Sequence, residues 1–192
     1  ACQFIHPITF ETLTGHKCLV DTFDRQFEFD VAHVSLGKKA DVMLVAPATA
    51  NVIGKMASGI ADDMLTTTAL AMRCRVLVAP AMNTAMYRHP IVQDNLKKLA
   101  SFGFGIITPA TGHLACGDEG EGKLPPEELL VDYVVQEIAH KKDLLGKKVM
   151  VSAGPTIEPM DPVRFISNHS TGKMGYEIAK AAARRGAEVT LV

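Results

Sequence analysis

Two segments of the chain echo each other, and they restrict the possible fold more than any other feature. "DVMLVAPATAN" at 41–51 and "RVLVAPAMN" at 75–83 each run a continuous apolar stretch into Ala-Pro-Ala and, soon after, an asparagine. Continuous apolar runs, rather than alternating ones, are typical of strands with helices on both faces. We therefore expect two parallel strands whose following loops lie at the same edge of one sheet.

The rest of the chain continues the alternation of strands and helices. Further apolar strands are expected at 104–112, 147–156 and 187–192, and helices at 53–72, 89–102, 127–142 and 172–186. This order predicts an α/β fold with a doubly wound, mainly parallel sheet. In such sheets ligands bind at the carboxyl ends of the strands, which is where the Pro, Gly and Asn loops of this chain fall.

Composition excludes several classes of partner. The 192 residues are 47% hydrophobic and carry a net charge of −1 with both signs interspersed, so neither nucleic acid nor an anionic membrane surface is an expected partner. Charges or glycines interrupt every apolar run, so we expect no membrane span. The four cysteines lie far apart without Cys-x-x-Cys spacing, which favours free thiols in a reducing cytoplasm over disulfides or a metal site.

Both ends of the sequence depart from this scheme. Residues 1–30 contain no glycine-rich first strand turn, with which a doubly wound domain should begin. We therefore expect the chain to start after a first strand and helix, and to stop at Val192 on a strand of a second domain.

The loops after the first two strands offer candidate site residues. Asn51 and Asn83 are each open to two interpretations, a helix N-cap or a ligand contact. Thr49 and the neighbouring backbone amides could meet a phosphate or the edge of an isoalloxazine ring. His33 stands alone before a short amphipathic helix, and on local sequence a surface histidine or one with its hydrogen bonds satisfied is favoured over a functional one.

The segment "HLACGDEGEGKL" at 113–124 places Cys116 among glycines. Glycines let a loop fold over a ligand and reopen, so a lid is one interpretation and a disordered linker is the other. The nearby acids Asp118, Glu119 and Glu121 would raise the pKa of the thiol. We therefore expect Cys116 to act as a proton donor rather than as a thiolate nucleophile.

Three motifs resemble those of phosphopantothenoylcysteine decarboxylases, which are flavin-dependent cysteine decarboxylases: "APATANVIGKMASGIADDMLTTTAL", "VLVAPAMNTAMYRHP" and "GHLACGDEGEGKL". "VSAGPTIEPMDPVRFISNHSTGKMGYEIAKAAARRGAEVTLV" resembles the start of phosphopantothenate–cysteine ligases. The order is similar to that of bifunctional coenzyme A biosynthesis proteins. The resemblance implies a flavodoxin-like decarboxylase domain at 1–143, lacking its first strand and helix, and a truncated, Rossmann-like ligase domain at 144–192.

The resemblance also implies FMN as cofactor, a small-molecule substrate, phosphopantothenoylcysteine, and a trimer-based homo-oligomer with the flavin site between subunits. His33 matches the active-site histidine that assists proton removal, and Cys116 matches the proton donor. Asn83 and Met86 match substrate contacts, with Asn83 holding the carboxylate that is lost. The matching flavin-binding positions are Thr49, Ala50, Asn51, Val52 and Ala81.

The chemistry implied by the resemblance explains these residue types. Flavin first oxidises the thiol-bearing carbon, and the resulting thioaldehyde can delocalise the electrons left by carbon dioxide. Asn83 would hold the carboxylate without neutralising it, because a salt bridge would stabilise the ground state. One departure is Lys123-Leu124, where the family more often has Arg-Met; the charge is kept but a bidentate contact is weakened.

The ligase part is shorter. "SNHSTGKMG" meets neither a dinucleotide nor a P-loop spacing, so on spacing alone an ordinary glycine-rich turn is favoured. By resemblance, the complete ligase uses CTP and Mg²⁺, Asn168 stabilises an acyl-cytidylate, and Arg164 assists with the substrate phosphate. We expect no ligation by this chain, because the rest of the ligase is absent from it.

Alternative functions remain within the same superfamily. One is a non-enzymatic, flavoprotein-like regulatory subunit, and others are peptidyl-cysteine decarboxylases and flavin prenyltransferases. A flavodoxin-like electron carrier needs neither Asn83 nor a thiol lid. The joint presence of His33, Asn83 and Cys116 favours an enzyme, and the ligase start favours coenzyme A biosynthesis.

Overall fold

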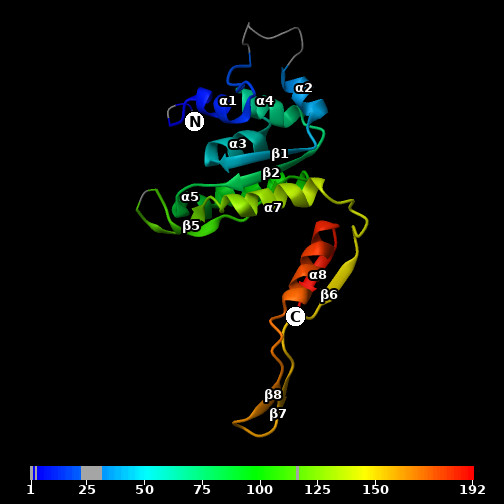
Figure 1. Ribbon diagram of the computed structural model, residues 1–192. Helices are drawn as coiled ribbons and strands as arrows, with labels where there is room; N and C mark the ends of the chain where they lie inside the picture. The colour runs from blue at the N-terminus through cyan, green and yellow to red at the C-terminus, as the bar shows by residue number, and fades with distance from the viewer. Residues whose placement is uncertain (1, 3, 23–31, 116) are drawn as a thin grey trace. The chain divides into compact units, whose positions relative to one another are not determined.

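The computed structural model describes residues 2, 4–22, 32–115 and 117–192, and it divides the chain into two compact units (Figure 1). The first unit runs from Ala1 to Leu130 and the second from Val131 to Val192. Within the described residues, no helix is long and apolar enough to cross a membrane. The two units are described separately below.

The first unit is built on a three-stranded parallel sheet in the order β1 (Val42–Ala48), β2 (Arg75–Pro80) and β3 (Gly105–Ile106). Leu44 is in register with Leu77, which in turn is in register with Gly105. Every residue of β2 from Val76 to Pro80 is buried. Because successive side chains point to opposite faces, both faces of this strand are covered, as the continuous apolar run predicts.

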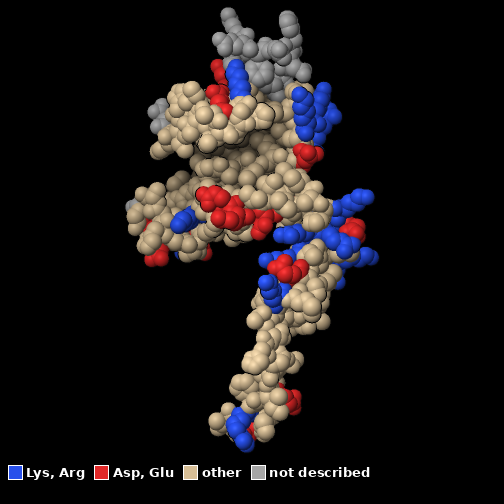
Figure 2. All heavy atoms as spheres, in the orientation of Figure 1, with Lys and Arg blue, Asp and Glu red and all other residues tan. Residues whose placement is uncertain are grey.

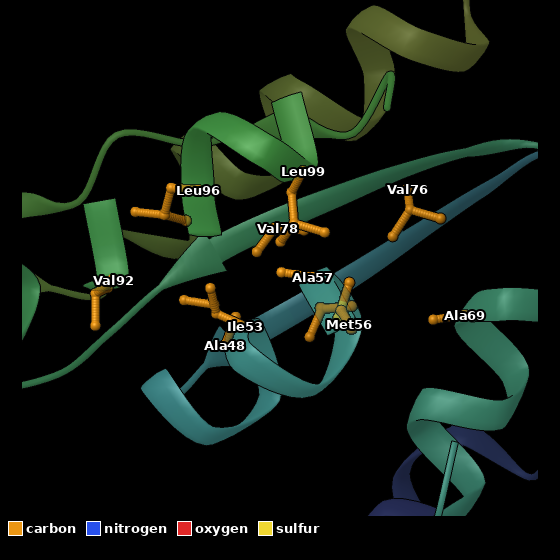
Figure 3. Close-up of a cluster of buried hydrophobic side chains, with 11 residues drawn as sticks. Ala48, Ile53, Met56, Ala57, Ala69, Val76, Val78, Val92, Leu96 and Leu99 are labelled. Carbon is orange, nitrogen blue, oxygen red and sulfur yellow. The ribbon is translucent and has the colours of Figure 1, made fainter. Parts of the chain in front are cut away.

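The core of this unit lies between the sheet and two helices on one face, α3 (Ala50–Ser58) and α6 (Pro90–Ser101). Figure 3 shows the side chains of both helices pointing toward those of the strands. Ile53 of α3, Leu99 of α6 and Val78 of β2 are each 0% exposed. These side chains fix the start of α3 against the end of the sheet, where the candidate site residues lie.

The single helix expected at 53–72 is wrong, because the structure has two helices there. Gly59 ends α3 in the left-handed conformation, with φ 70°. Asp63 begins α4 (Met64–Ala71) as its N-cap, with the Thr66 amide donating to Asp63 Oδ1 at 2.8 Å. Lys55 Nζ pairs with Asp63 Oδ2 at 2.9 Å. Burial alone would raise the pKa of Asp63, but hydrogen bonds from Thr66 and Lys55 lower it below the ordinary value.

The strand expected at 104–112 is also divided. Its first part is β3 of the parallel sheet, whereas its end is β4 (Ala110–His113), which pairs antiparallel with β5 (Glu119–Lys123). The glycine-rich segment is therefore a β-hairpin in its described residues, rather than a linker. Cys116 lies outside the described residues.

Among the described residues, three further helices lie wholly in the first unit: α1 (Pro7–Thr14), α2 (Ala32–Lys39), which packs on α4, and α5 (Thr84–Arg88), which follows β2. Helix α7 (Glu127–Ile138) contains the boundary between the two units.

The second unit contains a parallel strand pair joined by a helix. Strand β6 (Lys148–Val151) pairs with β9 (Glu188–Leu191), and α8 (Lys173–Arg184) packs on both. Between β6 and α8, an antiparallel hairpin is formed by β7 (Ile157–Pro159) and β8 (Phe165–Ser167). This strand–helix–strand order is what the sequence predicts for the start of a second α/β domain.

Basic side chains gather around α8 and β6 in the second unit, as Figure 2 shows. Lys142, between α7 and β6, has an internal role, because its Nζ donates to the carbonyl oxygens of both Gln136 and Arg184. These carbonyls belong to the ends of α7 and α8, where helix dipoles favour a positive charge. Lys142 therefore ties the C-terminal ends of two helices together.

Candidate active site

Two loops lie side by side where β1 and β2 end. The Ala81 amide, after β2, donates to the carbonyl oxygen of Ala48 at the end of β1, at 3.0 Å. Thr49 then starts α3 as its N-cap, with its hydroxyl accepting from the Val52 amide at 3.4 Å. The cap interpretation of Asn51 is therefore wrong, because Thr49 supplies the cap and Asn51 lies inside the first turn.

The surface around these loops suits a flavin ring. Thr49 and Asn51 are exposed, so their polar groups can meet a ligand, while Ala50, Val52 and Ala81 are half-buried and small. The first-turn amides of α3 add donors and the positive end of a helix dipole. This set offers hydrogen-bonding groups to the polar edge of a flat ring and an uncharged surface to its face.

Asn83 follows β2 and starts α5. Its Oδ1 accepts from the Ala85 amide at 2.8 Å, which confirms the cap interpretation of this residue. Because Oδ1 is used in this way, the orientation of the side-chain amide is fixed and Nδ2 is aimed away from the helix. Nδ2 donates to Asp118 Oδ2 at 3.4 Å. The Asn83 amide therefore presents a donor to a carboxylate in this structure.

Besides the bond between Asn83 and Asp118, three contacts attach the hairpin β4–β5 to this loop and to α5. The Met82 amide donates to the carbonyl oxygen of Gly122 at 2.9 Å. The Thr84 hydroxyl donates to the carbonyl oxygen of Glu121 at 2.7 Å. Arg88 Nε also pairs with Glu121 Oε2 at 3.0 Å. The described part of the segment is therefore a docked hairpin rather than a free loop, and its action as a lid stays a prediction.

A cavity of about 490 Å³ lies between the hairpin and the β2–α5 loop. Its size is within the range of small-molecule sites. Three of its lining side chains carry polar groups: the amide of Asn83, the imidazole of His113 and the ammonium of Lys123. Among the described residues, the lining consists of Ala81, Met82, Asn83, His113, Leu114, Ala115, Gly122, Lys123 and Leu124.

The structure brings some of the predicted residues together and not others. Ala81 and Asn83 line the cavity, whereas His33 and Met86 do not. His33 lies on α2, which packs on α4, and is half-buried. Met86 lies on α5 and is 49% exposed.

Sequence reasoning missed His113 and Thr84. His113 is the last residue of β4, whose first residues the sequence pattern assigns to the parallel strand expected at 104–112. Thr84 has no local sequence signal, because its hydrogen-bond partner, Glu121, is 37 residues away.

The predicted ligase residues lie in the second unit. Asn168 Oδ1 accepts from the Ser170 amide at 2.9 Å, just before the turn into α8. Arg164 Nε pairs with Asp161 in the turn between β7 and β8. Hydrogen bonds from the Val163 amide and from Arg164 lower the pKa of Asp161.

Comparison with known proteins places these features in context. The pattern of the family described as Flavoprotein matches residues 1–139, and that of the DNA/pantothenate metabolism flavoprotein C-terminal domain matches residues 144–192. The coenzyme A biosynthesis bifunctional protein CoaBC of Bacillus subtilis is 49% identical over 100% of this chain and 48% of its own length. A cysteine/cysteine sulfinic acid decarboxylase from an unknown prokaryotic organism is 50% identical, over 98% of this chain and 54% of its own length.

The fold is similar to that of a solved PPC decarboxylase, a cysteine-to-serine mutant complexed with pantothenoylaminoethenethiol. The TM-score is 0.58 and the identity 33%, over 62% of this chain and 68% of that one. The flavodoxin-like α/β fold is thereby confirmed. The chain spans about half the length of the curated relatives it matches.

Proposed function

We propose a function for this chain on the premise that it belongs to the flavoprotein family, whose pattern spans residues 1–139. The first unit, with FMN bound, removes the cysteine carboxylate of 4′-phosphopantothenoylcysteine and yields 4′-phosphopantetheine, a step of coenzyme A biosynthesis. The observation that carries the proposal is the fixed amide of Asn83, which faces a cavity at the carboxyl end of β2 and donates to a carboxylate.

Asn83 binds the substrate carboxylate in this proposal. An amide donor orients the carboxylate without cancelling its charge, so the charged ground state is not over-stabilised. The bond from the Ala85 amide holds the Asn83 side chain in place before substrate arrives, which reduces the entropy lost on binding.

FMN supplies the two-electron oxidation and reduction that make loss of carbon dioxide possible. The residues that would hold it are Thr49, Ala50, Asn51, Val52 and Ala81, on the two adjoining loops. Thr49 and Asn51 are exposed and the other three are half-buried, so none of the five is closed off from a ligand.

Three further residues have roles in the proposal. His33 takes up a proton during substrate oxidation, and Cys116 returns one to the product. Met86 contacts the substrate. Since His33 and Met86 do not line the cavity of one chain, we propose that the site is completed in a homo-oligomer, a trimer in which His33 comes from a neighbouring subunit.

The second unit is the start of a CTP-dependent phosphopantothenate–cysteine ligase in this proposal. The match of residues 144–192 to the flavoprotein C-terminal domain supports it. Asn168 would stabilise the acyl-cytidylate and Arg164 would assist with substrate phosphate, with Mg²⁺ on the nucleotide. We also propose a cytoplasmic location, which suits the described cysteines Cys2, Cys18 and Cys74, all free thiols.

The 50% identical cysteine/cysteine sulfinic acid decarboxylase makes a smaller substrate the second candidate. The cavity favours the larger one, because it has the volume for a pantothenoyl group and two basic side chains, His113 and Lys123, for an anionic end.

The test measures carbon dioxide release by the full-length, FMN-loaded protein from three substrates: 4′-phosphopantothenoylcysteine, cysteine and cysteine sulfinate. The proposal expects the highest kcat/KM for the first. A higher kcat/KM for cysteine or for cysteine sulfinate would identify that amino acid as the substrate. No release of carbon dioxide from any of the three would contradict the proposed decarboxylase activity.

A further inference from the structure

We infer that Thr84 and Arg88 are positioning residues, which fasten strand β5 to the Asn83 loop through Glu121 and thereby hold one wall of the substrate cavity. Neither residue lines the cavity or contributes to the candidate chemistry. Their role follows from what they hold in place.

The attachment is concentrated at Glu121. The Thr84 hydroxyl donates to its main-chain carbonyl oxygen at 2.7 Å, and Arg88 Nε meets its carboxylate at 3.0 Å. The main chain of Glu121 is thus held by Thr84 at the start of α5, and its side chain is held by Arg88 at the end of the same helix. The bond from the Met82 amide to Gly122 extends the contact along β5.

Two glycines permit this close approach. A Cβ atom at Gly120 would lie 2.4 Å from Thr84 Oγ1, and one at Gly122 would lie 2.3 Å from the carbonyl oxygen of Met82. Gly122 also has φ +115°, a conformation that residues with side chains rarely adopt. The glycines on either side of Glu121 therefore let β5 lie against the loop, where Thr84 and Arg88 contact Glu121.

The fastened strand leads directly into the cavity. Lys123 and Leu124, which follow the attachment, line the cavity, and Asn83 lies between Met82 and Thr84 on the other side of the contact. The attachment therefore fixes the main-chain distance between Asn83 and Lys123, two residues that line the cavity. In a substrate with a carboxylate at one end and a phosphate at the other, that distance sets how both ends are bound; this consequence rests on the proposed function.

A matched pair of variants tests the inference in the full-length, FMN-loaded protein. Thr84→Val removes the hydroxyl and keeps the side-chain shape, whereas Thr84→Ser keeps the hydroxyl. Ser101→Ala is the control, because it removes an equivalent bond, Ser101 Oγ to the Lys98 carbonyl oxygen at 2.7 Å, at the far end of α6. The measurements are amide hydrogen exchange of residues 119–124 and the KM and kcat for 4′-phosphopantothenoylcysteine.

We expect exchange in 119–124 to become about fivefold faster in Thr84→Val, the effect of losing one hydrogen bond, and to stay unchanged in Thr84→Ser and Ser101→Ala. The KM should rise by up to about the same factor, with a smaller effect on kcat, because the wall binds substrate. Gly120→Ala, which places a methyl group against Thr84, should have the same effects. Unchanged exchange in both Thr84→Val and Gly120→Ala would overturn the inference, whether or not the protein decarboxylates this substrate.

Discussion

Replacing Asn83 with aspartate separates the structural role of this residue from its proposed chemical role. Aspartate is as good an N-cap as asparagine, so the bond from the Ala85 amide to the side chain is kept and α5 should persist. The substitution changes the other polar atom of the side chain: the Nδ2 donor of asparagine becomes a carboxylate oxygen that faces Asp118 Oδ2.

The distance between these atoms sets the size of the effect. Two unit charges 3.4 Å apart repel by about 1 kcal/mol at the dielectric constant of water and by about 5 kcal/mol at an effective value of 20. Asp118 is exposed and Asn83 is half-buried, so the repulsion lies between these limits. The introduced charge would repel the substrate carboxylate in the same way. We expect kcat/KM for decarboxylation to fall by roughly tenfold to a thousandfold at pH 8.

The effect of the Asn83→Asp substitution should depend on pH. A neighbouring carboxylate raises the pKa of the introduced carboxyl, so its repulsion is present above that pKa and is relieved as the pH falls through it. Protection of the hairpin from hydrogen exchange should therefore be reduced at pH 8 in Asn83→Asp and recover as the pH is lowered toward about 5.

The double variant Asn83→Asp/Asp118→Asn exchanges the donor and the carboxylate between the two positions. It should restore protection at pH 8 without restoring decarboxylation, because the substrate still meets a negative charge. Wild-type decarboxylation by Asn83→Asp at pH 8 would refute the proposed role of the Asn83 amide.

Two further predictions concern stability. Asp63→Ala should lower the free energy of unfolding by about 1–2 kcal/mol at pH 7, measured with denaturant, because α4 loses its cap and Lys55 loses an ion-pair partner. Since the pKa of Asp63 is lowered in the folded protein, the difference from wild type should shrink as the pH falls below about 4. A difference that grows at lower pH would contradict this role of Asp63. Lys142→Met should lower the thermal midpoint of the second unit, because two carbonyl oxygens at helix ends lose a charged donor, a cost of about 1–3 kcal/mol. An unchanged midpoint would show that Lys142 does not stabilise the joint between α7 and α8.

The parallel core could be predicted from sequence because its signal is local. The apolar run of β2 indicates that both faces of this strand are covered, whereas β1, at the edge of the sheet, has a similar run but is only partly buried. The cap at Asn83 follows from residue type and position. The sequence pattern does not predict the break between α3 and α4, because the Ala, Met and Leu residues around Gly59 and Asp63 favour one continuous helix. A left-handed glycine followed by an aspartate cap is a signal that could have located the break.

The hairpin was harder to predict because its stability comes from distant contacts. Its strand β5 consists of glycine and glutamate followed by one lysine, residues with low intrinsic strand propensity. The contacts that hold it, Thr84 with Glu121 and Met82 with Gly122, join residues about forty positions apart, as the 37-residue separation of the first pair illustrates. Sequence alone therefore identifies the glycine-rich segment but neither its hairpin structure nor the loop on which it docks.

The most direct test of the central claim is a crystal structure of the full-length protein with FMN and an unreactive analogue of 4′-phosphopantothenoylcysteine that keeps its carboxylate. The account predicts the isoalloxazine ring against Thr49–Val52 and Ala81, and the analogue's carboxylate within hydrogen-bond distance of Asn83 Nδ2. A ring bound elsewhere, or a carboxylate held by another residue while Asn83 Nδ2 remains with Asp118, would contradict it.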